Sequence, residues 1–444
     1  MAPTPETARS PRLAASASFI GSTVEYYDFF AYGAATALVF DKLFFSALDP
    51  ATAVLASMAT FGAGYLARPV GAVVFGHIGD RVGRKSALIA TLMIMGVATV
   101  LIGCLPTYAQ VGVAAPIMLV LLRLLQGAAA AGEWGGAVAL SLEHAPNHRR
   151  GLYASFTNSG ALAGSTLASV VFVIASTLPT DQFLSWGWRV PFLLSAVLVV
   201  LGLVLRAKLP EPPTFAELRR SREALPVVTV LTQYGSSVVR VIGCSLYTVI
   251  ATIAGVFALS YAVQVGAATA TTMLVVKLIS TTTAVAVQPL CGLVADRIGR
   301  RPVFAVGGVI CAGATFLLFW AIGAHALPLI FVGHFLLVAV GYSMANGVAP
   351  AMYAEMFTTP VRYTGTALSS QLGQLVTGFA PAIAATLVVV AGGDWIWVAV
   401  ATAGACLVSA AAALTVRETY RTSFEDLGAQ EAAPAPQPAK LVRP

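Results

Sequence analysis

A short charged motif occurs twice in this chain, at the same place in each of two apolar halves. GHIGDRVGRK (76–85) matches GLVADRIGRR (292–301) in its glycine, aspartate and arginine positions, at an offset of 216 residues. Each copy ends one long apolar segment and begins the next. A repeated charged hairpin of this kind indicates a membrane protein built by duplication, with two similar helical units.

The composition agrees with a chain whose surface faces lipid. Of the 444 residues, 58% are hydrophobic and only 10% are charged, whereas soluble domains carry about 25% charged residues. The apolar segments are long enough to cross a hydrocarbon core of roughly 30 Å as helices. The five cysteines lie inside apolar segments and form no CxxC, so neither a disulfide framework nor a metal site is expected.

Hydropathy predicts six spans in each half. The spans are 17–40, 53–77, 86–105, 112–142, 152–178 and 189–207, then 238–262, 270–294, 303–323, 328–356, 364–391 and 395–416. We therefore predict an all-α integral membrane protein with twelve transmembrane helices in two pseudo-symmetric six-helix bundles. The expected parts are an N-terminal tail (1–16), an N-terminal bundle (17–207), a linker (208–237), a C-terminal bundle (238–416) and a disordered tail (417–444).

Basic residues predict the orientation. The formal charge of +7 raises nucleic acid or anionic lipid as partners, but the positions of the charges favour membrane topology instead. With a cytoplasmic N-terminus, 20 of the 26 lysines and arginines fall in cytoplasmic segments, four fall within spans, and only Lys42 and Arg189 fall in outer segments. This asymmetry predicts that both termini and the linker are cytoplasmic, with the chain in a bacterial inner membrane.

Several motifs resemble those of the major facilitator superfamily. The two charged motifs are similar to its loops between helices two and three and between helices eight and nine, and RLLQG (123–127) resembles its helix-four signature. VEYYDFFAYG (24–33), LRLLQGAAAAGEWGGA (122–137) and FLSWGWRVPFLLS (183–195) resemble the metabolite:proton symporter family, which includes transporters of shikimate, α-ketoglutarate, citrate and proline/betaine. The resemblance implies two bundles around a central cavity that opens alternately to each side.

The resemblance also implies that the loop motifs form a cytoplasmic gating network. Glu143 lies seven residues before Arg150, as Glu355 does before Arg362, and these residues are expected to complete the latch. The basic residues alternatively serve only to fix the topology. The expected gating residues are Gly76, Asp80, Arg81, Arg84, Glu143, Arg150, Asp296, Arg297, Arg300, Glu355 and Arg362.

Ionisable residues inside spans are costly and therefore indicate function. Glu25 and Asp28 share one face of the first span, which Tyr32 extends, and Arg123 lies in the middle of the fourth span. In related sugar/proton symporters, an aspartate on helix one pairs with an arginine on helix four, so the resemblance implies an Asp28–Arg123 pair. We expect Asp28, Arg123 and Glu25 to couple transport to protons; a static structural pair is the alternative.

Other polar residues at membrane depth are candidates for substrate binding, with helix packing as the alternative for each. They are Tyr32, Arg68, Gln126, Glu133, Asn158, Tyr247, Asn346, Gln371 and Gln374. Lys277 is expected to snorkel toward the outer interface, with anion selectivity as the alternative. Gly160 and Gly164 form a GxxxG that is typical of helix packing.

We predict a proton-coupled symporter that imports a small organic acid, such as shikimate or a related carboxylate, by alternating access. A proline/betaine importer is the main alternative. A drug/proton antiporter is disfavoured because NSGALAGSTLASVV (158–171) lacks the proline of that branch. No enzyme motif is present. The expected partners are the substrate, protons and the bilayer, without nucleic acid or cofactor, and we expect a monomer.

Overall fold

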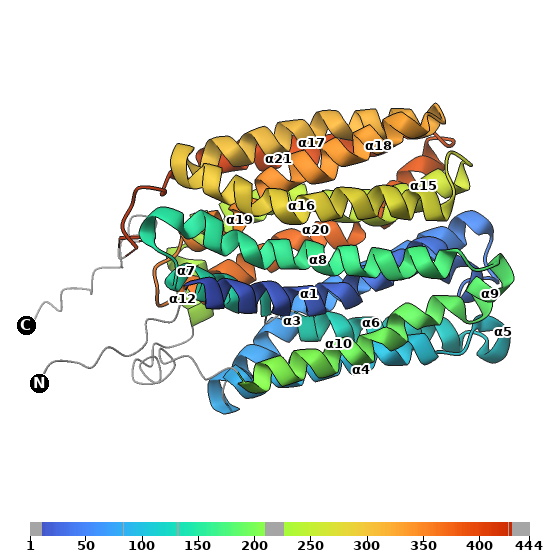
Figure 1. The fold of residues 1–444 in the computed structure, drawn as a ribbon, viewed down its shortest axis with the longest axis horizontal. Coiled ribbons are helices and arrows are strands. Elements are labelled where there is room, and N and C mark those ends of the chain that lie inside the picture. Colours follow the sequence, from blue (N-terminus) through green and yellow to red (C-terminus); the bar gives the residue numbers. More distant parts are fainter. Residues whose placement is uncertain (1–10, 83, 131–132, 209–225, 425, 429–444) are drawn as a thin grey trace, which may run out of the picture.

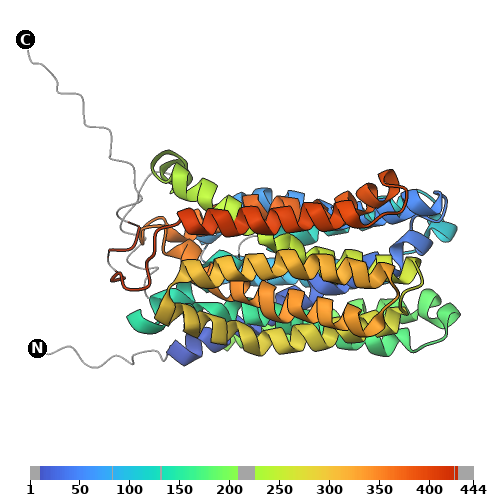
Figure 2. The same ribbon diagram turned by 90° about the horizontal axis from the view of Figure 1, so that it is seen from above.

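The computed structural model describes residues 11–82, 84–130, 133–208, 226–424 and 426–428. All regular structure within these ranges is helical. The helices run along one axis as an elongated bundle, and α1 begins at the same end at which α21 finishes (Figure 1, Figure 2). We call this end the terminal end and the opposite one the distal end.

The helices make twelve passes along this axis within the described residues. The first six are α1 (Pro11–Leu38), α3 (Pro50–Val82), α4 (Arg84–Cys104), α6 (Ala114–Ala130) with α7 (Glu133–Glu143), α8 (Arg150–Ser176) and α10 (Val190–Lys208). The short helices α2 (Phe40–Leu43), α5 (Tyr108–Val111) and α9 (Thr180–Ser185) form the distal connections.

The second half repeats this pattern with more irregular helices. Its passes are α13 (Gly235–Ser245), α14 (Val249–Thr252) and α15 (Ala258–Gln264), then α16 (Ala270–Ile298), α17 (Arg300–Gly323), α18 (Leu327–Phe335) with α19 (Ser343–Ala354), α20 (Arg362–Val390) and α21 (Ile396–Thr415). Two passes contain π-helical segments, Ile253–Phe257 (η4) and Leu336–Tyr342 (η5). The short α12 (Pro226–Gln233) precedes the first of these passes.

Each predicted span coincides with one of these passes, and the ends differ by six residues or fewer. Seven of the described helices are long and apolar enough to cross a membrane by length and composition. The largest differences arise where helices continue past the apolar stretch, because backbone hydrogen bonding does not stop where hydropathy falls. The all-α fold is confirmed. The linker boundary stays a prediction because residues 209–225 lie outside the description.

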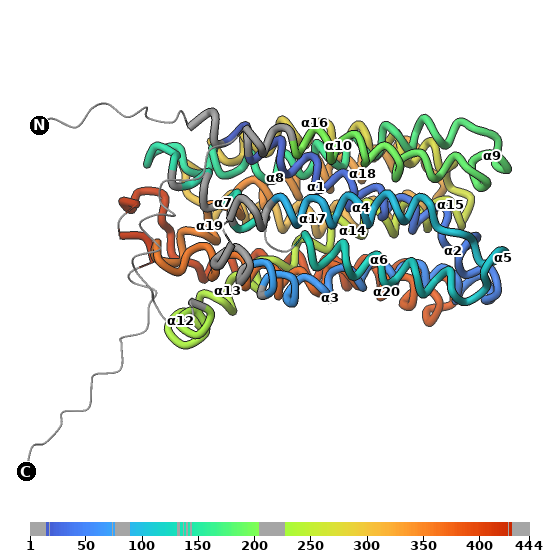
Figure 3. The backbone as a smooth tube through the Cα atoms, turned by 90° about the horizontal axis from the view of Figure 1, so that it is seen from below, coloured from blue at the N-terminus to red at the C-terminus, as the bar shows by residue number. Residues whose placement is uncertain are grey.

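Glycines set the close contacts of α8. This helix packs along α1 in its own half and along α16 of the other half, while α3 lies beside α20 (Figure 3). A Cβ on Gly292 would lie 2.6 Å from the Gly151 carbonyl oxygen, and one on Gly164 would lie 2.7 Å from the Tyr27 nitrogen. Both are too close for any side chain, so these helices meet backbone to backbone. The packing role predicted for Gly164 is confirmed.

Candidate functional site

The centre of the bundle contains two arginines stacked on one aromatic ring. The guanidinium carbon of Arg123 (α6) lies 4.6 Å from the Phe29 ring centroid, and that of Arg68 (α3) lies 4.9 Å from it. Arg123 also stacks on Tyr32 at 4.2 Å, and Arg68 on Tyr65 at 4.3 Å. Cation–π contacts of this kind stabilise desolvated cations without neutralising them. Both positive charges therefore persist in the interior.

The expected direct ion pair between Asp28 and Arg123 is not formed. Asp28 instead accepts a hydrogen bond from Ser195 on α10 and contacts the Thr99 hydroxyl on α4. Arg123 donates to Gln126 Oε1 at 2.7 Å, and Gln126 Nε2 donates to Thr99 Oγ1 at 2.6 Å. The physical reason is that Phe29 occupies the Arg123 side of α1, while Asp28 faces α4 and α10. The two charges are thus joined by a chain of two side chains, which we call the Thr99–Gln126 relay.

Arg68 reaches across to the other half of the molecule. Its Nη1 donates to Gln374 Oε1 at 3.1 Å and to Gln371 Oε1 at 3.4 Å, both on α20. The side chain is only 3% exposed. Three of the predicted binding residues are therefore brought together, and they join the two bundles.

A second group of predicted residues also spans the two halves. Asn158 Nδ2 on α8 donates to the Asn346 carbonyl oxygen at 2.8 Å, and Asn158 Oδ1 accepts from the Trp134 indole at 2.8 Å. The Tyr247 hydroxyl donates to Asn346 Oδ1 at 2.8 Å. Tyr32, by contrast, donates to Thr60 within its own bundle. The first group faces the bundle interface, whereas Tyr32 links α1 to Thr60 of α3 and stacks on Arg123 of α6.

The prediction that Lys277 snorkels toward the outer interface is wrong. Its side chain is 4% exposed and points inward, with Nζ 5.4 Å from the Phe30 ring centroid. It lines a cavity of about 20 Å³, room for little more than a water molecule. The cavity is lined from both bundles, by Phe30, Leu162 and Ser165 on one side and by Lys277, His334 and Tyr342 among others on the second. The centre is therefore closed around a residual polar space.

The terminal end is closed by a buried cluster of charges that crosses the two halves. Arg150 Nε lies 3.0 Å from Glu355 Oε1, Arg300 Nη2 lies 3.1 Å from the same oxygen, and Arg300 Nη1 lies 2.7 Å from Asp296. We call Arg150, Asp296, Arg300 and Glu355 the latch. Burial alone would raise the pKa of Glu355, but Arg300 and Arg150 outweigh it and hold that pKa below its ordinary value.

Asp296 has a second function in the latch. Its two carboxylate oxygens accept from the backbone N–H groups of Gly151 and Leu152 at 2.8 and 2.9 Å. These N–H groups belong to the first turn of α8, which has no partners inside its own helix. A carboxylate there also interacts favourably with the helix dipole. The close approach of Gly151 and Gly292 permits this contact between bundles.

The expected pairing of Glu355 with Arg362 is wrong. Glu355 binds Arg150 and Arg300 instead, while Arg362 donates to the carbonyl oxygens of Ala354 and Phe357. Arg362 begins α20 and turns back over the preceding loop, so its side chain holds that loop.

Arg297 was expected to be a gating residue, but it is exposed and makes no hydrogen bond or ion pair within the described residues.

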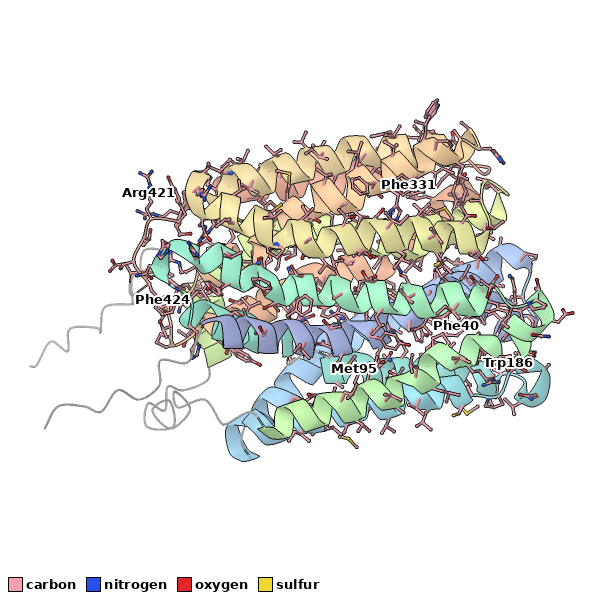
Figure 4. The ribbon with its side chains drawn as sticks, in the orientation of Figure 1. Phe40, Met95, Trp186, Phe331, Arg421 and Phe424 are labelled. Atoms are coloured by element: carbon pink, nitrogen blue, oxygen red, sulfur yellow. The ribbon has the colours of Figure 1, made fainter. Side chains whose placement is uncertain are left out.

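The segment after α21 packs onto the latch, which corrects the expectation of disorder from residue 417 onward. Arg150 Nη2 donates to the carbonyl oxygens of Thr419 and Thr422 at 3.0 and 2.9 Å. Glu418 accepts from the backbone N–H of Arg300 at 2.8 Å and so caps α17. Figure 4 shows Phe424 at the terminal end, where its ring lies 4.4 Å from the Arg362 guanidinium carbon. Residues 429–444 lie outside the description.

For some predicted residues, the structure describes the backbone position but not the side chain. Gly76, Asp80 and Arg81 lie in the last part of α3, and Arg84 begins α4. Glu133 and Glu143 begin and end α7. Their side chains lie outside the described part of the structure, so their predicted roles stay predictions. Glu25 is described and buried on α1.

Sequence reasoning missed several residues at this site. Thr99 and Ser195 are single hydroxyls in apolar spans, and Phe29 and Phe30 read as ordinary core aromatics. His334 is 1% exposed and bonds Ser280 through Nδ1 at 2.9 Å. The signal for Phe29 and Phe30 was their position directly after Asp28. Within the described residues, no group of three or more metal-binding side chains occurs.

The chain matches known transporters over most of its length. The family model for sugar (and other) transporters matches residues 13–225, and that of the major facilitator superfamily matches residues 241–443. The shikimate transporter of Escherichia coli is 38% identical over 419 residues, covering 92% of this chain and 95% of that protein.

Two further relatives and one solved structure agree. An inner membrane metabolite transport protein of Escherichia coli is 40% identical, covering 84% of this chain and 86% of its own, and the proline/betaine transporter of Salmonella typhimurium is 33% identical, covering 85% and 78%. The proton:xylose symporter XylE has the same fold, with a TM-score of 0.73 at 17% identity over 95% of this chain and 98% of its own. The chain is a transporter rather than an enzyme, and it belongs to the major facilitator superfamily.

Proposed function

We propose that this protein is a proton-coupled symporter that imports a small organic acid, such as shikimate or a related carboxylate, by alternating access. The observation that carries this proposal is the charge at the centre. Three buried cations, Arg68, Arg123 and Lys277, surround the Phe29–Phe30 pair, and none forms an ion pair with a described residue. Uncompensated buried charge costs several kcal/mol, and a bound carboxylate would offset that cost.

The aromatic faces argue in the same direction. A betaine ammonium group is recognised by open aromatic faces. Here both Phe29 and Phe30 already face cations, at 4.6 Å from Arg123 and 5.4 Å from Lys277. A cationic group of the cargo would be repelled from these rings, whereas an anion would be attracted. This favours an organic acid over the proline/betaine cargo named for some relatives.

We propose that Asp28 carries the coupled proton and that the Thr99–Gln126 relay transmits its state to Arg123. The Thr99 hydroxyl has two acceptors in reach, the Met95 carbonyl at 2.9 Å and the Asp28 carboxylate. An ionised Asp28 attracts this hydroxyl, and a protonated one releases it to Met95. Either change rotates the Thr99 hydroxyl, which alters the hydrogen bond that it accepts from Gln126. The position of Gln126 in turn affects the hydrogen bond that Gln126 accepts from Arg123.

The latch supports a cycle in which the two ends open in turn. Its ion pairs hold α8 against α16 at the terminal end, and the small central cavity is that of an occluded state. The excess of basic residues at this end supports a cytoplasmic location for it, by the positive-inside rule. In the proposed cycle, cargo and proton enter from the outside, the latch breaks, and both leave into the cytoplasm of a single-chain transporter.

Uptake into proteoliposomes under an imposed pH gradient tests this function. Labelled shikimate, other monocarboxylates and betaine form the panel, with a proton uncoupler as control. A monoanion moving with one proton carries no net charge, so its accumulation should follow the pH gradient and ignore voltage. A zwitterion moving with one proton gains about 2.3 kcal/mol per 100 mV, so voltage-driven betaine uptake would establish the alternative instead.

A further inference from the structure

Lys277 differs from the two buried arginines in having no hydrogen-bond partner among the described residues. Arg68 and Arg123 donate to glutamine side chains. The Lys277 ammonium makes no hydrogen bond or ion pair with a described residue, and it faces the Phe30 ring at 5.4 Å. An ammonium carries three donors, and leaving all three unused in the interior is costly. Such a group is retained where a ligand supplies the acceptors.

The surroundings of Lys277 keep space in front of its ammonium. Gly255 faces it from η4, where an added Cβ would lie 3.8 Å from Nζ, in ordinary van der Waals contact. His334 also lines this space, with Nδ1 hydrogen-bonded to the Ser280 hydroxyl and its ring close to the backbone of Ala254. The cavity between them is bounded by η4 and η5. Segments of π-helix are frequent at functional sites.

The cavity also lies between the bundles, where a transported molecule must pass. Phe30, Leu162 and Ser165 line it from the N-terminal bundle, and Thr281 and Tyr342 add hydroxyls from the C-terminal bundle. Hydroxyl donors, an imidazole and an ammonium around one space match the needs of a carboxylate, which has about four lone-pair positions.

We propose that Lys277 is the residue that binds the carboxylate of the transported acid, assisted by His334, while Arg123 and Arg68 serve proton coupling and bundle closure. This assignment rests on the proposed function, namely that the cargo is an organic anion. It places the carboxylate-binding site on the C-terminal bundle and the proton site on the N-terminal bundle. Cargo and proton would then act on different halves of the molecule.

The test uses the purified full chain and measures binding from thermal stabilisation by shikimate, succinate and benzoate, with betaine as the zwitterionic control. Lys277→Met should weaken the carboxylate that binds the wild type by roughly 10- to 100-fold, the range for a charged hydrogen bond. Lys277→Arg should weaken it less. Gly255→Ala keeps the charge but places a methyl group against Nζ, and should also weaken binding. Lys42→Met, the same change at an exposed residue, should leave binding unchanged.

Stability without ligand separates a binding role from a structural one. A lysine that serves the fold would destabilise the protein when removed, whereas Lys277→Met should melt at or above the wild-type temperature because it removes an unpartnered buried charge. Binding within threefold of the wild type in Lys277→Met would overturn the inference and leave the proposed function intact. If no carboxylate binds or is taken up by the wild type, the proposed function itself fails.

Discussion

Buried charge is handled in opposite ways in two regions of this molecule. In the latch, Arg150 and Arg300 share the Glu355 carboxylate, and Asp296 is satisfied by Arg300 and by two backbone N–H groups. Around Phe29 and Phe30, two arginines and a lysine stack on aromatic rings and form no ion pair with a described residue. We infer that charges that compensate one another set the conformation, whereas the uncompensated charges at the centre serve the cargo and the proton.

The two regions also differ in how they cross the bundle interface. The latch crosses it with buried ion pairs, and separating one partner of such a pair is strongly destabilising because it leaves a buried charge uncompensated. The centre crosses it with hydrogen bonds to side-chain amides, from Arg68 to Gln374 and from Asn158 to Asn346, each worth only about 0.5–3 kcal/mol. The terminal end is therefore suited to switching and the centre to rearranging around a solute.

The largest effect should come from the proton site at the centre. Asp28→Asn mimics the protonated acid permanently, so it should lower proton-driven accumulation more than about 100-fold while exchange of labelled substrate across the membrane persists. Uptake and exchange in proteoliposomes are the measurement. Asp49→Asn, at an exposed distal residue, is the matched control. Unchanged accumulation in Asp28→Asn would remove Asp28 from the mechanism.

The latch should affect turnover rather than affinity. Removing one partner of a buried ion pair typically costs about 3–5 kcal/mol, so Glu355→Gln should destabilise the state closed at the terminal end and reduce turnover roughly 10- to 100-fold. Substrate affinity should change much less. Arg297→Gln in the same motif should behave as the wild type, because Arg297 is exposed and unpaired within the described residues. A fall in affinity without a fall in turnover would contradict the latch.

The relay should give a smaller, graded effect. Thr99→Val removes the hydroxyl between Asp28 and Gln126 and should reduce accumulation roughly tenfold, the worth of about one hydrogen bond. Thr99→Ser keeps the hydroxyl and should retain most of it. The accumulation ratio at fixed pH gradient is the measurement. Equal accumulation ratios in Thr99→Val and Thr99→Ser would show that Thr99 contributes to helix packing and not to the relay.

The smallest effect should be that of pH on the latch. The pKa of Glu355 is held below its ordinary value, so its stabilising contribution is complete above the unfolded pKa of about 4.3 and is lost only as pH falls through the folded value. Distances between spin labels across the terminal end, measured without substrate, should stay constant from pH 8 to pH 5. The Glu355→Gln variant is the reference. Opening near pH 6 to 7 would show that the latch itself titrates.

The sequence predicted the fold well because its signals are simple. Apolar length and the repeated motif are local patterns, and they place twelve helices to within a few residues. The residues of the site were mostly found by the rule that charge in a span is functional. Partners were harder to predict. Arg150 bonds Glu355 from the other half, and no spacing within one half reveals that. The direction of Lys277 depends on how α16 is rotated against α8, which hydropathy alone does not specify.

The segment after α21 has a practical consequence. Because Thr419 and Thr422 are held by Arg150 and Glu418 caps α17, this short stretch ties the end of one bundle to the start of a helix in the other. A fluorescent protein fused directly behind α21 would displace it, whereas a reporter placed beyond Gly428 would leave it seated. Fusion site is therefore an experimental variable in its own right, and a truncation series through this stretch would show how strongly the tether biases the transport cycle.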